Sequence, residues 1–345
     1  MSINEQTIQA ALKTVIDANT GKDLVSSRCV KNIRISGSDV ALDVELGYPA
    51  KSQIDGLRTA VIAQLKAIPG IGNVSANVFS KIVTHAVQKG VKLIPGVKNI
   101  IAVASGKGGV GKSTTAVNLA LGLAAEGATV GLLDADIYGP SLPQMLGIAN
   151  GRPESADGKG LEPMEAHGIQ AMSIGFLIDP EQPMVWRGPM VTQALTQLLT
   201  ETRWRDVDYL VIDMPPGTGD IQLTIVQTVA LSGVIIVTTP QEVALIDARK
   251  AVAMFAKTNV PVLGIVENMS YFLCPGDGKH YDIFGTGGGS REAARLQVPL
   301  LGEVPIEPLV RQAGDIGRPA VASHPGSTAA GVFREVAKKV ANVTQ

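Results

Sequence analysis

Residues 100–115 read IIAVASGKGGVGKSTT, a short apolar run followed by a glycine-rich loop and the start of a helix. Gly106 to Ser113 match the G-x-x-x-x-G-K-[ST] spacing of a phosphate-binding loop, in the strand–loop–helix context that such a loop needs. Glycines let successive backbone N–H groups curl around a phosphate, and the helix N-terminus adds partial positive charge. The residues predicted to bind a nucleotide here are Gly106, Lys107, Gly108, Gly109, Val110, Gly111, Lys112, Ser113 and Thr114.

Four side chains of this loop have separate interpretations. Lys112 is expected to reach the β- and γ-phosphates, and the Ser113 hydroxyl to bind Mg²⁺. Lys107 is a second lysine that ordinary phosphate loops do not require. We expect it to neutralise phosphate charge, and the alternative is a solvated surface lysine. Thr114 alternatively serves only as a residue of the first helical turn.

Apolar runs of strand length recur along the chain after residue 97, and helical stretches lie between most of them. Continuous apolar strands that alternate with helices indicate a parallel sheet covered on both faces. We therefore predict an α/β fold, a P-loop NTPase with a mostly parallel sheet and helices on both faces. The predicted strands are 100–104, 129–134, 209–213, 234–238 and 261–266, and the predicted helices include 112–126, 191–201 and 242–257.

Acidic residues stand where two of these strands end, which is where ligands bind in parallel sheets. Asp213 is expected to hold Mg²⁺ through a water molecule, and Gly217 lies in the flexible part of the switch loop that follows. Asp136 is expected to orient the attacking water, so that Lys107, Lys112 and Asp136 are the side chains assigned to catalysis. Asp134 and Asp136 alternatively serve only as turn residues at a strand end.

Asn268 follows a further strand and is expected to hydrogen-bond the edge of a purine base. A guanine site normally has an aspartate three residues after such an asparagine, and Tyr271 occupies that position here. The sequence therefore favours adenine, with ATP as the nucleotide. The alternative for Asn268 is a hydrogen-bonded turn at the strand end.

The first 80 residues have a different pattern, which predicts a small α+β domain. Strands are predicted at 30–36, 39–46 and 74–79, and helical stripes at 8–16 and 54–65, the first beginning with a capping box of Ser2 and Glu5. No cluster of residues in this part carries obvious chemistry. The predicted organisation is a domain at 1–80, a linker or docking segment at 81–97 and the nucleotide-binding domain at 98–345.

Composition excludes several classes of protein. Of 345 residues, 45% are hydrophobic and 18% are charged, a balance that predicts a folded chain of about two domains. The formal net charge of −1 removes the simplest electrostatic reason to expect nucleic acid or an anionic membrane as a partner. Two cysteines, Cys29 and Cys274, cannot form a disulfide framework. No basic-then-apolar signal segment opens the chain, and we expect a cytoplasmic protein.

Lys107 beside Lys112 resembles the deviant Walker A loop of the MinD, ParA and nitrogenase-iron-protein group. Within that group, the longer motifs are similar to the Mrp family of iron–sulfur cluster carrier ATPases. Residues 1–80 resemble the MIP18-type domain often fused in front, although its usual Asp-Pro-Glu turn reads Asp17-Ala18-Asn19 and its cysteine is absent around 46–50. The motifs that carry the Mrp resemblance lie at 97–115, 134–141, 185–190, 213–220, 267–271 and 283–289.

This resemblance implies a slow, Mg²⁺-dependent ATPase that assembles or transfers iron–sulfur clusters to apoproteins, with iron–sulfur assembly proteins as further partners. It implies a homodimer with ATP at the subunit interface, in which Lys107 reaches across to the phosphates bound by the partner subunit. It also implies a [4Fe–4S] cluster shared between the subunits.

The sequence departs from the family at the cluster motif. The family's Cys-Pro-x-Cys reads Cys274-Pro275-Gly276-Asp277, so two protomers offer two thiolates where four usually hold a [4Fe–4S] cluster. Asp277 and His280 are the nearest other ligands, and Cys29 is expected to be a small core residue. Two functions stay open: a cluster carrier that depends on Cys274, and a nucleotide-switched dimeric scaffold that binds no cluster.

A third function, a membrane-positioning ATPase like MinD, needs an amphipathic C-terminal helix that binds a bilayer. The apolar residues of the last helical stretch form one ordinary stripe, which indicates packing on the sheet instead. The stripe consists of Val332, Phe333, Val336 and Val340.

Overall fold

The computed structural model describes residues 3–85, 91, 93–155, 157–177 and 188–344. The chain divides into two compact units, an N-terminal unit up to Val83 and a C-terminal unit from Thr84 to Thr344. This division falls inside the segment 81–97, which the sequence predicts as a linker. Of the Mrp-like motifs, the first half of the one at 185–190 lies outside the described residues.

The N-terminal unit packs two helices on a three-stranded sheet. The strand order is β1-β2-β3, with β1 and β2 antiparallel and β2 and β3 parallel. Along β2, Val40, Leu42, Val44 and Leu46 are buried and alternate with less buried residues, which is why one face of the sheet carries the core. The elements are α1 (Glu5–Leu12), β1 (Val30–Ser36), β2 (Asp39–Leu46), α2 (Ile54–Lys66) and β3 (Val74–Ser80).

Three predictions for this unit need correction. The helical stripe predicted at 8–16 is too long, because α1 ends at Leu12 and Ile16 forms an isolated β-bridge with Asp23. The capping box of Ser2 and Glu5 is wrong, because Glu5 is the first helical residue and Asn4 accepts the hydrogen bond from the Thr7 N–H at 2.9 Å; Ser2 lies outside the described residues. Cys29, expected in the core, is only half-buried, and its partial burial raises the pKa of the thiol.

The C-terminal unit contains a sheet of eight strands among the described residues, in the order β13-β10-β9-β4-β8-β5-β7-β6. Every neighbouring pair is parallel except β6 and β7. The strands are β4 (Val97–Ala104), β5 (Val130–Asp134), β6 (Met164–Ala166), β7 (Ile169–Ser173), β8 (Val207–Asp213), β9 (Gly233–Thr238), β10 (Val262–Glu267) and β13 (Leu300–Glu303). The predicted α/β class is confirmed.

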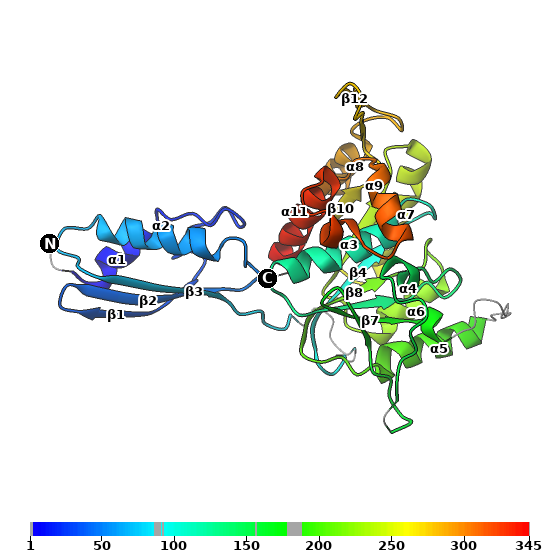
Figure 1. The fold of residues 1–345 in the computed structure, drawn as a ribbon, viewed down its shortest axis with the longest axis horizontal. Helices are drawn as coiled ribbons and strands as arrows, with labels where there is room; N and C mark the ends of the chain where they lie inside the picture. Colours follow the sequence, from blue (N-terminus) through cyan, green and yellow to red (C-terminus); the bar gives the residue numbers. More distant parts are fainter. Residues whose placement is uncertain (1–2, 86–90, 92, 156, 178–187, 345) are drawn as a thin grey trace. The chain divides into compact units, whose positions relative to one another are not determined.

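Helices cover both faces of this sheet, as Figure 1 shows. On one face, α5, α6, α7 and α8 pack their apolar residues against alternate residues of the central strands, such as Ile100, Ala102 and Ala104 of β4. On the other face, α3 packs against α11. The helices are α3 (Lys112–Ala125), α4 (Leu142–Met145), α5 (Gly188–Glu201), α6 (Asp220–Thr228), α7 (Glu242–Lys257), α8 (Gly288–Leu296), α9 (Pro308–Asp315), α10 (Ala320–Ser323) and α11 (Thr328–Val343).

The last helix, α11, packs as its apolar stripe predicts. Phe333, Val336 and Val340 are fully buried, and the helix contacts α3 and β13. No helix within the described residues combines the length and the apolar character that crossing a bilayer requires.

Candidate functional site

The predicted phosphate loop connects β4 to α3 at the carboxyl edge of the sheet. Gly109 has a φ of +82° and Gly111 a φ of +83°, a left-handed conformation that L side chains rarely adopt. A Cβ on Gly106 would come within 2.2 Å of the Asp247 carbonyl in α7. The glycines at these three positions therefore let the loop curl and let α7 approach it.

Asn268 holds this loop from the end of β10. Its amide nitrogen donates to the Val110 carbonyl at 2.9 Å, and a Cβ on Gly111 would lie 2.0 Å from the same nitrogen. The side chain also lines a cavity of about 690 Å³, where a base is expected, together with Thr114, Pro305 and Ile306. The structure thus adds a contact that sequence reasoning missed.

We expect Gly111→Ala to destabilise the protein and to weaken nucleotide binding. The left-handed backbone costs an alanine about 1–2 kcal/mol, and the new methyl group would displace Asn268. Thermal unfolding and calorimetric titration with ATP measure the two effects. The matched control is Gly108→Ala, because Gly108 has no positive φ and no atom within 4 Å of the added Cβ. Equal stability of the two variants would contradict the prediction.

Lys112 is buried among acidic side chains in the phosphate cavity. Its Nζ lies 2.6 Å from Asp213 Oδ1, 3.8 Å from Asp136 Oδ2 and 3.2 Å from Ser113 Oγ. Asp213 is fully buried, and its Oδ2 has no hydrogen-bond partner among the described residues. The structure therefore brings together four of the residues that the sequence assigns to catalysis and Mg²⁺.

The carboxylates of this cavity have raised pKa values. Burial, opposed by the Lys112 ammonium, raises the pKa of Asp213 and of Asp136. Burial and the neighbouring Asp213 raise the pKa of Asp134 to about 7. More acidic groups thus lie at or behind the cavity than Lys112 compensates, and the unpaired Asp213 Oδ2 is a suitable acceptor for a water of a bound Mg²⁺ ion.

A second loop closes this cavity and carries the predicted Gly217. The Gly217 N–H donates to the Ser105 carbonyl at 2.9 Å, and Gly217 has a φ of +96°. Gln222, buried in α6, donates its amide to the carbonyls of Pro215 and Pro216 at 2.8 and 3.0 Å. The sequence did not predict these contacts, because a single glutamine in a helix does not indicate which backbone carbonyls its side chain will meet.

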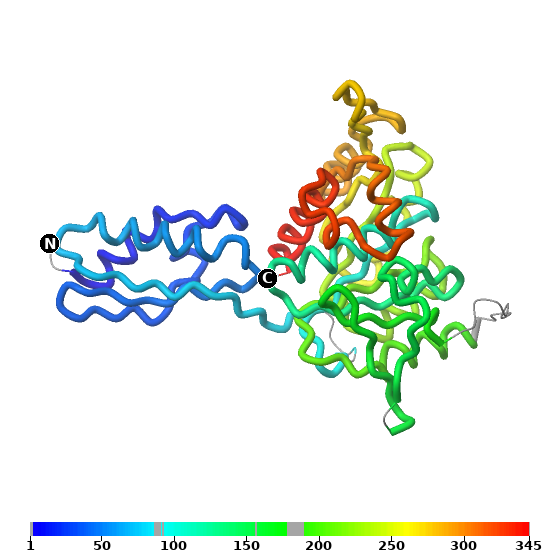
Figure 2. Tube along the Cα trace, viewed as in Figure 1, coloured from blue at the N-terminus to red at the C-terminus, as the bar shows by residue number. Residues whose placement is uncertain are grey.

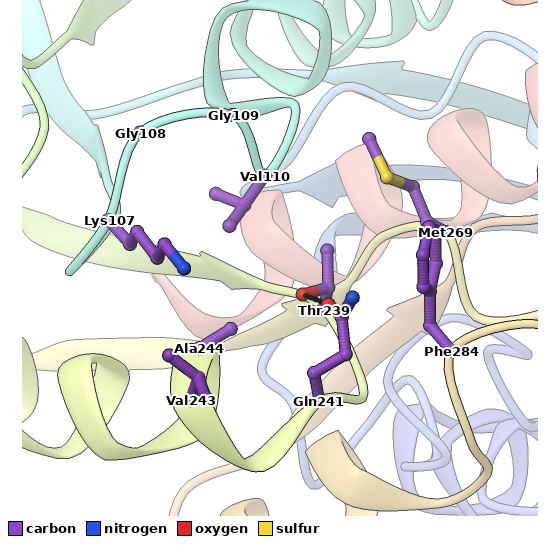
Figure 3. A pocket seen from close by; sticks show the side chains of 10 residues that line it. All are labelled: Lys107, Gly108, Gly109, Val110, Thr239, Gln241, Val243, Ala244, Met269 and Phe284. Atoms are coloured by element: carbon purple, nitrogen blue, oxygen red, sulfur yellow. Dashed lines mark hydrogen bonds between the residues drawn. The ribbon is translucent and has the colours of Figure 1, made fainter.

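Lys107 is exposed, and it is one of the residues that line the phosphate cavity of about 230 Å³ with Lys112 and Asp136. It lines a cavity of about 370 Å³ whose far wall contains Met269 and Phe284, with Gln241 and Val243 between (Figure 3). Within the described residues, no ion pair engages its ammonium group. Lys107 thus differs from Lys112 in exposure, because Lys112 is buried.

Cys274 lies in a tight turn between β11 (Phe272–Leu273) and β12 (His280–Tyr281), a hairpin that projects from the C-terminal unit (Figure 2). Its carbonyl accepts a hydrogen bond from the Gly278 N–H. The Asp277 carboxylate accepts from the Lys279 N–H and from the Tyr281 hydroxyl, and His280 packs edge-on against Tyr271. Within the described residues, no three His, Cys, Asp or Glu side chains gather closely enough to hold a metal ion.

Two family models match the chain. The one described as "NUBPL iron-transfer P-loop NTPase", under the name ParA, matches residues 96–341. The one described as "Iron-sulfur cluster assembly protein" matches residues 5–78.

Curated relatives cover most of the chain. The "Iron-sulfur cluster carrier protein" of Escherichia coli strain K12 is 51% identical over 309 residues, which cover 89% of this chain and 84% of that protein. The protein of the same name from Deinococcus radiodurans is 47% identical over 331 residues, 96% of this chain and 93% of that protein.

Solved structures resemble about two thirds of the chain. A nucleotide-binding protein from Archaeoglobus fulgidus, in complex with ADP, is 41% identical with a TM-score of 0.58, covering 65% of this chain and 88% of its own. The cell division ATPase MinD of Pyrococcus furiosus shares the fold at 22% identity, with a TM-score of 0.52, over 70% of this chain and 98% of its own.

Proposed function

The chain belongs to the family of NUBPL-type iron-transfer P-loop NTPases, and from this premise we propose that it is an ATP-hydrolysing carrier that delivers iron–sulfur clusters to apoproteins. The observation that carries the ATPase part is Lys112 at the start of α3, buried against Asp213 and beside Asp136. The cluster part is supported by the family and by relatives named iron-sulfur cluster carrier proteins.

The phosphates of ATP bind in the cavity of about 230 Å³ between the loop and Asp136. The loop N–H groups surround the β-phosphate, and Lys112 exchanges its bond to Asp213 for the β- and γ-phosphate oxygens. Ser113 and Asp213 would hold Mg²⁺, Asp213 through a water. The ion, when bound, neutralises phosphate charge; the residues of the chain orient the reacting groups.

The base occupies the neighbouring cavity of about 690 Å³. Asn268 donates one of its two amide N–H groups to the Val110 carbonyl, and we assign its oxygen as the acceptor for a base. An amide oxygen accepts from the exocyclic amine of adenine but opposes the O6 acceptor of guanine. We therefore assign ATP rather than GTP, and competition between the two nucleotides in a binding assay tests the assignment.

Hydrolysis takes place in a homodimer. The exposed ammonium of Lys107, at the mouth of the phosphate site and without an ion pair among the described residues, supplies positive charge to phosphates bound by the partner subunit. Asp136, half-buried beside Lys112, orients the attacking water.

Asp136→Ala is expected to keep ATP affinity within about threefold and to slow hydrolysis about 100-fold, because the residue aligns water without holding phosphate. The ATP-bound dimer then accumulates. Phosphate release and light scattering with ATP measure both effects, and Asp136→Asn, which keeps the shape of the side chain without its charge, should behave in the same way. Normal turnover, with only monomers in the presence of ATP, would remove this role from Asp136.

The cluster is carried at the dimer axis by Cys274 from each subunit, with other ligands completing the coordination. We expect a labile cluster, since two thiolates replace the usual four. The second candidate is a nucleotide-switched dimeric scaffold, favoured by aspartate at position 277 and by the absence of a three-ligand group within the described part of one protomer. Anaerobic reconstitution with iron and sulfide, read by iron content and visible absorbance, decides between them: no bound iron favours the scaffold.

A further inference from the structure

Asp134 is a fully buried carboxylate to which the function above gives no role. It is the last residue of β5 and pairs in register with Asp213 of β8 on one side and Ser173 of β7 on the other. Four donors converge on it from within 3.2 Å. Oδ1 accepts from the Asp136 N–H at 3.1 Å, and Oδ2 accepts from the N–H groups of Ser141 and Leu142 at 3.1 and 3.2 Å and from the Ser173 hydroxyl at 3.0 Å.

These bonds tie both ends of one loop to a single side chain. The loop begins at Ala135, whose N–H donates to the Asp213 carbonyl, and it ends at Ser141 where α4 starts. Between these points it reaches the surface, and Tyr138 is 63% exposed. Asp136 stands near the start of this loop: Asp134 accepts from its N–H, its carbonyl accepts from the Gly139 N–H at 3.2 Å, and Ile137 beside it is buried in the core.

We propose that Asp134 is the positioning residue for Asp136: its carboxylate fixes the Asp136 backbone and thereby places the Asp136 carboxylate beside the γ-phosphate. Asp134 itself touches no nucleotide, because all four of its bonds go to groups of the chain and it has no exposed surface. The inference rests on the proposed role of Asp136 in orienting water.

The chemistry of the four donors requires a carboxylate. An ionised aspartate has only acceptor sites, enough for all four bonds, whereas asparagine has one acceptor oxygen and one amino group that is itself a donor. In Asp134→Asn, the oxygen takes the side where Ser141, Leu142 and Ser173 donate. The amino group then opposes the Asp136 N–H, so the backbone of Asp136 loses its bond to this side chain and shifts away from it.

The first measurement is steady-state hydrolysis by Asp134→Asn in the full-length protein. We expect kcat to fall about 10–100-fold, because a small displacement of the Asp136 carboxylate costs that much in rate. The dissociation constant of ATP should stay within about threefold of the wild-type value. The matched control is Ser173→Ala, which removes one donor from the same carboxylate but leaves the bond to Asp136. The kcat of Ser173→Ala should stay within about twofold of the wild-type value, even when its thermal stability falls as much as that of Asp134→Asn. Wild-type kcat in Asp134→Asn, or an equal loss of kcat in Ser173→Ala, would overturn the proposal.

The second measurement is a double-mutant cycle. If Asp134 acts through Asp136, then Asp134→Asn adds nothing once the Asp136 carboxylate is gone, and the double variant turns over at the rate of Asp136→Ala. Additive losses would assign Asp134 a separate role and overturn the proposal. Normal turnover in Asp136→Ala would instead refute the premise, so that the two failures are told apart.

Discussion

Replacing Lys112 with alanine is expected to weaken ATP binding about 100-fold or more, because the variant loses charge-assisted hydrogen bonds to both the β- and γ-phosphates. We do not expect Lys107 to replace Lys112 within the same subunit, because Lys107 is exposed whereas Lys112 is buried at the start of α3. Calorimetric titration with ATP and Mg²⁺ measures the loss. Unchanged affinity would contradict the assignment of the phosphate loop.

The structure predicts a second effect of the same substitution. Lys112 pairs with Asp213, which is fully buried, and removing one member of a buried pair costs about 3–5 kcal/mol of unfolding free energy. A loss of ATP binding in Lys112→Ala therefore needs a control for folding.

The control is the double variant Lys112→Ala with Asp213→Asn, which removes the unpaired charge. We expect it to regain most of the thermal stability without regaining ATP affinity. Recovery of tight ATP binding in the double variant would mean that misfolding, and not loss of the lysine, explains the single variant.

Replacing Cys274 with alanine is expected to lower bound iron to background after anaerobic reconstitution and to leave ATP affinity unchanged. Iron–sulfur clusters need soft, anionic thiolate ligands, and Cys274 is the cysteine at the family's cluster position. The hairpin that carries it projects from the C-terminal unit, and Leu273 and Tyr281 beside it are 47% and 44% exposed, so a second subunit can approach the thiol. Iron content and visible absorbance measure the loss.

Cys29→Ala is the matched control, because it removes the other cysteine of the chain and should leave iron content unchanged. Full iron in Cys274→Ala would place the ligands elsewhere and refute the assignment carried over from the family motif. Absence of iron in the wild type would refute the carrier function itself.

We expect replacement of Asp277 or His280 to lower the amount of bound iron less than replacement of Cys274 does. Asp277→Ala removes a carboxylate that also holds the turn through the Lys279 N–H and the Tyr281 hydroxyl. Tyr281→Phe separates the two effects, since it loosens the same turn without removing a ligand. Iron lost in Asp277→Ala but kept in Tyr281→Phe would make Asp277 a ligand and not a support of the turn.

The central strands could be predicted because each is a continuous apolar run bounded by polar or turn residues. β8 and β9 are buried along most of their length, and their residues read as strands without any neighbour being known. The predicted positions of β4, β5, β8, β9 and β10 agree with the structure to within three residues at either end. β6, β7 and β13 were not predicted. β6 and β13 have three and four residues at the edges of the sheet, too few to show a pattern, and the buried β7 reads IQAMS, in which Gln170 interrupts the apolar run.

The sequence by itself determined the phosphate loop, because the left-handed glycines, the lysine and the helix start are local features that lie within 16 residues. It also determined which polar residues stand at the strand ends. The tertiary structure alone decided what these residues contact. Asn268 meets Val110 across 158 positions of the chain, Lys112 meets Asp213 across 101, and Asp134 collects a hydroxyl from Ser173, 39 residues away. Such contacts depend on strand order in the sheet, and strand order follows from how all the buried faces pack together, which no single stretch of sequence contains.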